Sequence, residues 1–336
     1  MDHKKLAELE VNESFTGFYA LRNVEIKEKK DGAPFLKLEI GDSSGRLPVV
    51  YWEDDSAAVF EEISGSEVVK IQGTGGLYRD LMQAVATQIR SAQEGEFDLA
   101  NLLPSGEKST EELSAELDVW IDSVSEPPLS KLLKSIFDDD ETRAKFLRAP
   151  AGKLWHGAYV GGLAEHSLNV AEICETAAKL FPLCRRDLVI TAALLHDIGK
   201  IRELEASAAI DYTARGRLLG HIVLGDRIIE RAAAKLSIPR KLADELSHIL
   251  LAHHGAGEFG SPVEPMNIEA ELLHQADLME SRGNAFTHVI ERDLPNAGEF
   301  SRWVKPVSRY LYIEGYRPEK PAQESLFPTE PGESPE

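Results

Sequence analysis

The N-terminal part of the chain consists of short apolar runs separated by turn residues. Residues 35–40 read Phe-Leu-Lys-Leu-Glu-Ile, a strict alternation that is typical of a strand with one buried face. Residues 56–63 lack this alternation and fit one short helix. The runs that we predict to be strands are residues 15–21, 35–40, 47–52, 67–73 and 81–89.

Five short strands with one helix after the third fit a small closed barrel of the OB type. We therefore assign residues 1–95 to an all-β barrel. Such barrels bind single strands by stacking bases on aromatic side chains along a basic groove. The nucleic-acid-binding candidates are Lys37, Trp52, Tyr78 and Arg79. Residues 1–98 contain 11 Lys and Arg against 19 Asp and Glu, so the barrel as a whole is acidic.

Beyond about residue 104 the apolar spacing becomes that of helices. Ser109 to Glu112 fits a helix start, and Pro127-Pro128 precedes one or two further helices. From 160 to 290 the pattern is all helical, with one helix expected after Gly161-Gly162 up to about residue 180 and others at 188–197, 220–236, 242–254 and 268–282. We assign residues 96–140 to a helical linker, 141–317 to an all-α domain, and 318–336, rich in Pro, Glu and Ser, to a disordered tail.

Composition restricts the class of protein. No apolar run approaches the roughly 18 residues of a membrane span, and no signal peptide is visible, so we expect a cytoplasmic protein. Cys174 and Cys184 are not in a Cys-x-x-Cys pattern and fit reduced thiols. The net charge of −20 repels nucleic acid at long range, so a polyanionic substrate requires local basic groups or bound cations.

Histidine and aspartate concentrate on apolar helices. Seven of the ten histidines lie between His166 and His274. A single buried histidine is more often a hydrogen-bonded core residue than a ligand. However, the pairs His196-Asp197 and His253-His254 both end apolar helices, where an uncompensated carboxylate would be costly. A metal ion compensates such groups, because it binds neutral imidazole and carboxylate together.

The order of these residues resembles that of HD-domain phosphohydrolases. Residues 194–200, Leu-Leu-His-Asp-Ile-Gly-Lys, resemble the signature of that superfamily. Four further blocks match in order: residues 161–168, 220–222, 253–262 and 269–277. With an N-terminal OB-type barrel, the whole arrangement is similar to the YhaM-type 3′–5′ exoribonuclease family, over roughly residues 10 to 310.

The resemblance implies a two-metal site. One ion would be held by His166, His196, Asp197 and Asp277, and the second by His221, His253 and His254, with Asp197 bridging. These ligands suit Mn²⁺ or Fe²⁺, while a purified sample could carry Zn²⁺, Co²⁺ or Ni²⁺.

Two further residues lie close in sequence to these ligands. Lys200 either contacts a phosphate or polarises the attacking water beside Asp197, or is a solvated lysine at a helix end. His274 is expected to support a ligand from behind. His156, His248 and His288 fit no block, and we treat them as structural.

Four functions fit these features. The first is a metal-dependent 3′–5′ exonuclease on single-stranded RNA, with single-stranded DNA as a second substrate. The second is a cyclic dinucleotide phosphodiesterase, since Gly260-Ser261-Pro262 nearly matches the Gly-Tyr-Pro of HD-GYP enzymes. The others are a nucleotide phosphohydrolase and a non-enzymatic nucleic-acid-binding regulator.

Two C-terminal segments have their own patterns. Basic and aromatic residues alternate from Arg302 to Arg317, which fits either an amphipathic helix or a channel beside the metals. In the tail, Gln323, Leu326 and Phe327 resemble the Gln-x-x-Leu-Phe peptide by which bacterial proteins dock on the sliding clamp. No feature of the sequence indicates an oligomeric state.

Overall fold

The structure is a computed structural model. It describes residues 3–79, 81–93, 95–97, 101, 102, 106, 108–152, 157, 159–206, 210–295, 298–304 and 307–317. His156 and the tail motif of Gln323, Leu326 and Phe327 lie outside these residues, so the clamp motif stays a prediction. The chain divides into two compact units, Met1–Ser281 and Arg282–Glu336.

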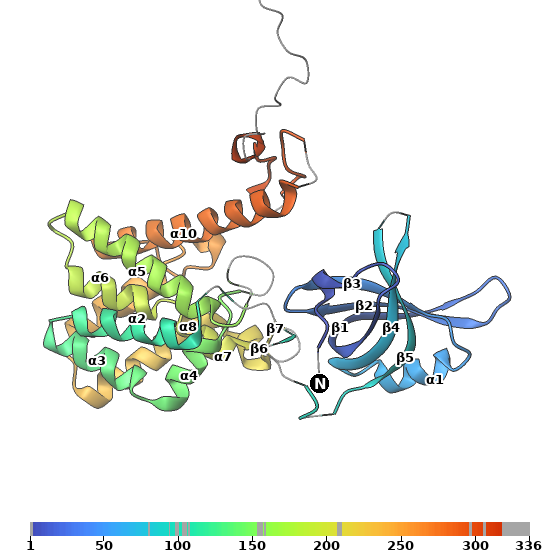
Figure 1. Cartoon of the computed structure of the whole chain (residues 1–336). Coiled ribbons are helices and arrows are strands. Elements are labelled where there is room, and N and C mark those ends of the chain that lie inside the picture. The colour runs from blue at the N-terminus through green and yellow to red at the C-terminus, as the bar shows by residue number, and fades with distance from the viewer. Residues whose placement is uncertain are drawn as a thin grey trace, which may run out of the picture. The chain divides into compact units, whose positions relative to one another are not determined.

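The N-terminal residues form a closed five-stranded barrel, as predicted. The strands β1 and β4 pair antiparallel and close the barrel, while β3 and β5 pair parallel. One helix lies between the third and fourth strands in sequence, which is the arrangement of an OB-type barrel (Figure 1). The elements are β1 (Ser14–Glu28), β2 (Pro34–Asp42), β3 (Gly45–Tyr51), α1 (Ser56–Ile63), β4 (Val68–Tyr78) and β5 (Leu81–Ser91).

The alternation along each strand decides which side chains fill the barrel. In β2, Leu36, Leu38 and Ile40 are buried, while Lys37 between them is exposed. Burying each such aliphatic side chain contributes about 1.5–3 kcal/mol. The outer face of the same strand is therefore free to carry the polar and aromatic groups expected to bind a ligand.

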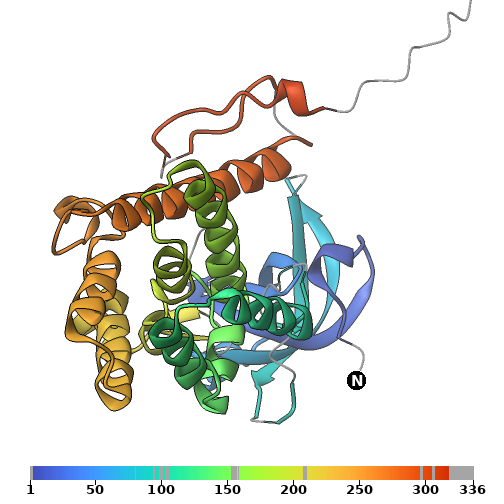
Figure 2. The ribbon, with the colours of Figure 1, turned by 90° about the vertical axis from the view of Figure 1, so that its left-hand side faces the viewer.

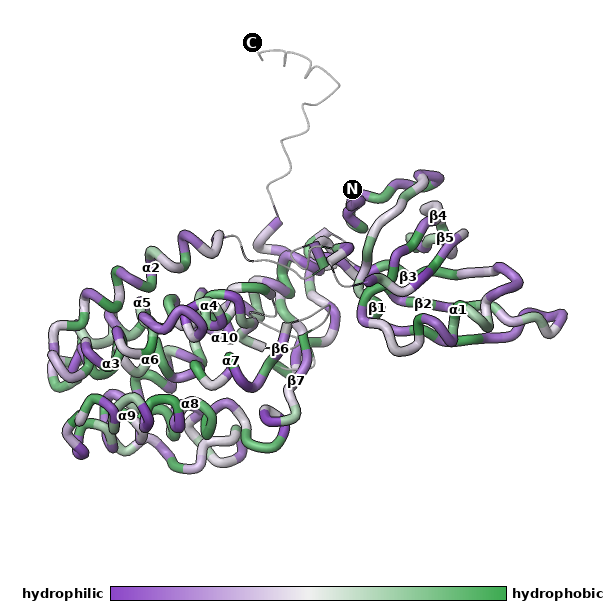
Figure 3. Tube along the Cα trace, turned by 90° about the horizontal axis from the view of Figure 1, so that it is seen from below, coloured by the Kyte–Doolittle hydropathy of each residue, from purple (hydrophilic) through white to green (hydrophobic). Residues whose placement is uncertain are grey.

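The following residues form a helical domain with one continuous core. Helices α5 and α6 lie side by side (Figure 1 and Figure 2), and Figure 3 shows the same for α8 and α9. None of the described helices is long and apolar enough to cross a lipid bilayer. The helices are α2 (Thr110–Ser123), α3 (Pro127–Phe137), α4 (Asp140–Arg148), α5 (Gly162–Leu180), α6 (Arg186–Leu195), α7 (Lys200–Glu203), α8 (Ala214–Leu236), α9 (Arg240–Ala252) and α10 (Ile268–Asp293).

Local sequence signals set the ends of several helices. Ser109 and Glu112 form a reciprocal capping box at the start of α2, as the sequence indicates. Gly220 has φ +70° and interrupts α8, so a helical stretch begins again at His221. Residues 110–137, assigned from the sequence to a linker, contribute Leu117, Leu129 and other side chains to the same core as α5 and α6.

Two segments differ from the predicted helical pattern. Strands β6 (Leu204–Ala206) and β7 (Ile210–Tyr212) form a two-stranded ribbon inside the region predicted to be all helical. Each strand has only three residues, which is too short for a periodicity along the sequence to predict it. Thr213 ends the ribbon, donating its hydroxyl to the Arg202 carbonyl and capping α8.

The amphipathic helix considered for Arg302–Arg317 is also wrong. Isolated antiparallel bridges join Phe300 to Tyr312 and Val304 to Arg309. Residues 310–313 alternate between exposed and buried with a period of two, which is the pattern of an extended chain.

Gly199, in the turn before α7, provides a test of how tightly this turn packs on α8. A Cβ at this position would lie 1.9 Å from the His221 carbonyl oxygen and 2.6 Å from the Gly225 nitrogen. We therefore expect Gly199→Ala to lower the free energy of unfolding by about 1–3 kcal/mol, as overpacking does. Denaturant unfolding followed by circular dichroism measures this change.

The matched control is Gly283→Ala in α10, because nothing lies within 4 Å of a Cβ there. This variant should unfold at the wild-type denaturant concentration or slightly above it, since alanine favours a helix by about 1 kcal/mol over glycine. Equal unfolding of Gly199→Ala and wild type would show that the turn does not pack closely on α8.

Candidate metal centre

Five helices and the turns that follow them bring the predicted ligands together. His166 lies on α5 and His221 on α8, while Asp277 lies on α10. His196-Asp197 directly follows α6, and His253-His254 directly follows α9. Because the ligands come from helices distant in sequence, only the packed domain assembles the site.

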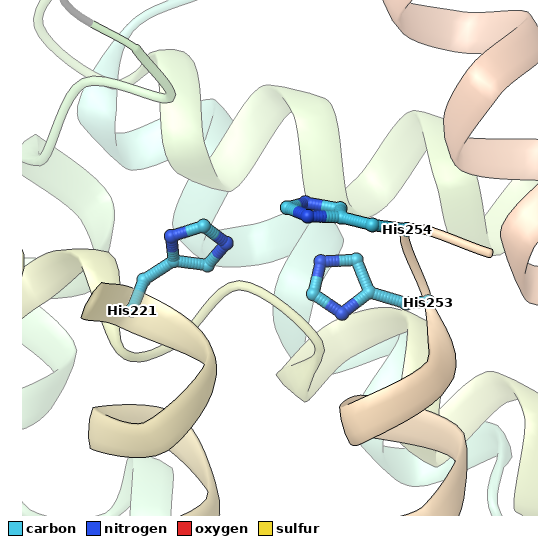
Figure 4. A group of neighbouring side chains, drawn as sticks. All are labelled: His221, His253 and His254. Atoms are coloured by element: carbon cyan, nitrogen blue, oxygen red, sulfur yellow. The ribbon is translucent and has the colours of Figure 1, made fainter. Parts of the chain in front are cut away.

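The ligand atoms form two groups. His166, His196 and Asp197 offer atoms that all lie within 4.8 Å of one another, and so do His221, His253 and His254. Figure 4 shows the rings of the second group facing one another, one from α8 and two from the end of α9. The second group equals the set that the sequence analysis assigned to the second ion, and the first group contains three of the four residues assigned to the first ion, without Asp277.

Asp197 reaches both groups through its two oxygens. Its Oδ2 lies 3.5 Å from His166 Nε2 and 3.4 Å from His196 Nε2. Its Oδ1 lies 3.4 Å from His221 Nε2 and 3.8 Å from His253 Nε2. One buried carboxylate thus presents one oxygen to each group, which is the geometry that a bridging ligand requires.

Asp277 belongs to the first group. Its Oδ1 lies 3.3 Å from His166 Nε2, and that nitrogen lies 3.1 Å from His196 Nε2. Two imidazole nitrogens and two carboxylate oxygens therefore converge on one small volume. Nitrogen and oxygen donors of this kind are the set that divalent transition metals bind.

Hydrogen bonds at the outer ring nitrogens orient the imidazoles. Nδ1 of His196 donates to the Ala193 carbonyl at 2.8 Å, and Nδ1 of His253 donates to the Leu250 carbonyl at 2.6 Å. Nδ1 of His254 donates to the carbonyl of Phe259 at 2.9 Å. Since the proton sits on Nδ1, each Nε2 keeps the lone pair that binds a metal.

Two carboxylates that the sequence analysis missed support the remaining rings. Glu280 Oε2 lies 2.6 Å from His166 Nδ1, and Glu203 Oε2 lies 3.1 Å from His221 Nδ1. Glu203 also accepts from the His221 backbone N–H, and both carboxylates are buried. Glu280 could have been found, because it lies three residues after Asp277 on one helix face. Glu203 has no comparable signal.

Unpartnered buried atoms test whether the site fits metal ions. Among the described residues, Asp197 Oδ1, His221 Nε2 and His253 Nε2 are buried and have no hydrogen-bond partner. Leaving such groups unsatisfied costs about 1–3 kcal/mol each. All three are ligand atoms in the two groups, so divalent ions would satisfy them. The side chains present therefore fit a pair of divalent cations.

The protonation states agree with this fit. Burial lowers the pKa of His253 well below its usual value and also lowers the pKa of His254, which keeps both rings neutral. Burial raises the pKa of Asp197, but Lys200 and His196 outweigh it and hold that pKa well below the usual range. Burial lowers the pKa of His166, yet the carboxylates of Asp277 and Glu280 raise it to about 10, so a metal must displace a proton there.

Lys200 and His274 both contact the ligand set. Lys200 Nζ lies 2.5 Å from Asp197 Oδ2, and its side chain is only 13% exposed, so it is not a solvated lysine. His274 Nδ1 donates to the His253 carbonyl at 2.8 Å, behind a ligand rather than among the ligands. His248 accepts from the Met266 N–H, which is the structural role expected of it.

The barrel candidates occupy two places on its surface. Trp52 stacks on Phe35 at 4.3 Å between ring centroids and is 43% exposed, and exposed Lys37 lies on the neighbouring part of β2. Tyr78 and Arg79 lie at the turn between β4 and β5, with the Arg79 guanidinium 5.3 Å from the Tyr78 ring centroid. Phe35 therefore lies in the same aromatic stack as Trp52.

Comparison with known proteins adds a family match for the helical domain. Residues 163–282 match the model of the HD domain, which defines a superfamily of metal-dependent phosphohydrolases. All seven predicted ligands fall inside this range. The chain thus combines an OB-type barrel with an HD domain.

Two solved structures resemble part of the chain. The second OB-fold domain of replication protein A from Methanococcus maripaludis is 18% identical, with a TM-score of 0.23, over 29% of this chain and 100% of that chain. The mitochondrial single-stranded DNA binding protein Rim1 from S. cerevisiae is 9% identical, with a TM-score of 0.21, over 25% of this chain and 99% of that chain. The OB-type assignment itself follows from the strand order of the barrel.

The two supporting carboxylates should affect different ions. We expect Glu280→Gln to weaken binding of one metal per chain by about 10- to 100-fold, because it loosens the ring of His166. Glu203→Gln should weaken binding of the other through His221. Titration of the metal-free protein with Mn²⁺, followed by calorimetry, separates the two affinities.

Exposed His288 provides the control, since it lies outside the ligand groups. His288→Ala should bind both ions with wild-type affinity. If Glu280→Gln and Glu203→Gln weakened the same single affinity, the ligands would form one site and not two.

Proposed function

We propose that this protein is a metal-dependent 3′–5′ exonuclease that hydrolyses the phosphodiester bonds of single-stranded RNA, with single-stranded DNA as a second substrate. The observation that carries the proposal is the Asp197 carboxylate, which presents one oxygen to each of two ligand groups. A two-metal centre of this type suits the displacement at phosphorus that phosphodiester hydrolysis requires. The proposed direction of cleavage comes from the resemblance to the YhaM-type family.

The roles of the side chains follow from their contacts. When bound, the two cations supply a hydroxide nucleophile at neutral pH and neutralise charge on the phosphoryl oxygens. Asp197 would bridge the ions, and the tethered imidazoles would hold them without rearrangement. Lys200 has its ammonium at the same carboxylate, so it is placed to contact a phosphate oxygen or the attacking water.

The ligand set also limits the choice of metal. Neutral imidazoles and carboxylates without any thiolate favour Mn²⁺ or Fe²⁺ over the softer ions. Affinity order alone would allow Co²⁺, Ni²⁺ or Zn²⁺ to occupy the same site in a purified sample. We therefore propose Mn²⁺ as the activating ion to test first.

The barrel would hold the strand. Trp52 and Tyr78 expose aromatic rings, and Lys37 and Arg79 place cationic groups on the barrel surface. Stacking on such rings is worth about 1–3 kcal/mol per base and does not depend on sequence. Since the barrel is acidic overall, these local groups and the metal ions would provide the attraction for phosphates.

A cyclic dinucleotide phosphodiesterase is the second candidate. The segment Gly260-Ser261-Pro262 contacts a ligand, because Ser261 Oγ accepts from the His254 N–H at 3.0 Å. Serine stands where the HD-GYP pattern has tyrosine, and here it fixes the backbone of a histidine. This contact gives Ser261 a structural role beside His254. A cyclic dinucleotide is therefore the alternative substrate.

The test is degradation of a 5′-labelled single-stranded RNA with Mn²⁺, beside DNA of the same length. We expect a ladder that shortens from the 3′ end. The variant Asp197→Ala should fall to about one hundredth of the wild-type rate or lower, because it removes the bridging ligand.

The rates on the two strands decide the preferred substrate. His288→Ala serves as the control and should cleave at the wild-type rate, since it contacts no ligand. No cleavage of either strand by protein that carries both ions would contradict the exonuclease. Cyclic dinucleotides would then be the next substrates to measure.

A further inference from the structure

The segment after α10 exposes an unusual number of aromatic side chains. Between residues 298 and 317 there are five aromatic residues, although aromatic residues make up only 7% of the whole chain. Every one is more than half exposed: Phe300 at 51%, Trp303 at 54%, Tyr310 at 59%, Tyr312 at 55% and Tyr316 at 61%. Exposed aromatic groups gathered in this way mark a surface that binds something.

The exposure is a consequence of how the segment folds. Two antiparallel bridges make it a ribbon, and we call residues 298–317 the C-terminal ribbon. Its aliphatic side chains Val304, Leu311 and Ile313 are buried in a small cluster with Val289 of α10. The alternation along the ribbon therefore puts the aliphatic groups on the helix and the aromatic groups on the opposite face.

A buried carboxylate fixes the ribbon to the helix. Asp293, 2% exposed, accepts from the guanidinium groups of Arg292 and Arg302 and from the Arg302 backbone N–H. These hydrogen bonds hold the pKa of Asp293 well below its usual value. The backbone that carries the aromatic face is therefore anchored to α10 through Asp293.

The rings pair across the ribbon and leave faces open. Phe300 and Tyr312 meet edge to face at 5.5 Å between centroids and 66° between planes. Trp303 and Tyr310 meet in the same way at 5.1 Å and 75°. In an edge-to-face pair, the ring that presents its edge has neither face covered by its partner. Each pair therefore offers a flat surface on which another planar group can stack.

The local charge is opposite to that of the whole chain. Residues 298–317 contain four Lys or Arg and two Glu, whereas the chain has a net charge of −20. Arg309, next to Tyr310, donates to the Val307 carbonyl and forms no ion pair with any described residue. The ribbon therefore combines flat rings with cationic groups on a protein that otherwise repels anions.

These properties select one kind of ligand. In the described part of residues 282–317, the large apolar side chains that are more than half exposed are all aromatic. The aliphatic side chains Val304, Leu311 and Ile313 of the ribbon are buried, so the surface that it exposes consists mainly of planar rings and cationic groups. Planar groups on an anionic backbone match the ribbon in both shape and charge.

We propose that the C-terminal ribbon is a base-stacking surface for single-stranded nucleic acid, additional to the barrel and the metal centre. The inference rests on the proposed function, because it supplies a second contact for the same substrate. Stacking without hydrogen-bonded base recognition predicts binding that tolerates any base and excludes duplexes, in which the base faces are already stacked.

The experiment measures binding and not cleavage, in a full-length chain that also carries Asp197→Ala. Fluorescence anisotropy gives the affinity for a labelled oligouridine of about 20 nucleotides. Trp303→Leu with Tyr310→Leu keeps apolar bulk but removes the rings, and should weaken binding by about tenfold or more. Trp303→Phe with Tyr310→Phe keeps the rings and should bind within about twofold of the parent.

Two controls accompany these variants. Phe181→Leu replaces a half-exposed aromatic ring elsewhere in the helical domain and should leave the affinity unchanged. Quenching of tryptophan fluorescence by oligouridine in the parent chain, reduced in Trp303→Phe, reports stacking at the ribbon without any loss of fold. Sedimentation measures whether any variant alters self-association.

The outcomes separate this inference from the proposed function. No binding of RNA or DNA by the parent chain would contradict the proposed function itself. If the parent chain binds and the leucine pair binds equally well, only the proposed role of the C-terminal ribbon would be overturned. If the phenylalanine pair and the leucine pair weakened RNA binding equally, stacking on the rings would also be overturned. If a variant changed the sedimentation of the protein but not its affinity for RNA, the ribbon would instead be a contact between copies of the chain.

Discussion

The helical domain is organised around one buried carboxylate. Asp197 is 2% exposed, yet it carries a negative charge and reaches two groups of ligands with its two oxygens. A buried charge is costly unless opposite charge compensates it, and Lys200 is the only cationic side chain among the described residues that forms an ion pair with it, apart from the histidines. Two divalent cations would compensate this charge much more strongly. The surrounding imidazoles and carboxylates are positioned to bind such cations.

The rest of the domain serves to hold the nitrogen ligands in place. Backbone carbonyls fix His196, His253 and His254, while Glu203 and Glu280 fix His221 and His166. Ligands that are already oriented need little rearrangement when a metal binds, so less of the binding free energy is lost. The glycine at position 199 allows the turn after Asp197 to lie against the His221 backbone, which brings ligands from two helices to the same centre.

The sequence predicted the elements whose pattern is local. Alternation along residues 35–40 indicated a barrel strand, and Ser109 to Glu112 indicated a helix start. The ordered blocks around His166, Asp197 and Asp277 indicated a metal centre. The β6–β7 ribbon and the C-terminal ribbon were missed, because their strands or bridged segments are too short to show a clear periodicity. The spacing from Asp277 could have revealed Glu280, whereas Glu203 meets His221 only through a tertiary contact that no spacing along the chain reveals.

The most direct test of a centre bridged by Asp197 is anomalous X-ray diffraction from crystals grown with Mn²⁺. Two anomalous peaks about 3.5–4 Å apart, with the Asp197 carboxylate between them, are the result that this account predicts. One peak among His166, His196 and Asp277 alone, with His221, His253 and His254 contacting no metal, would contradict it. In that case the second group of histidines would need a different explanation.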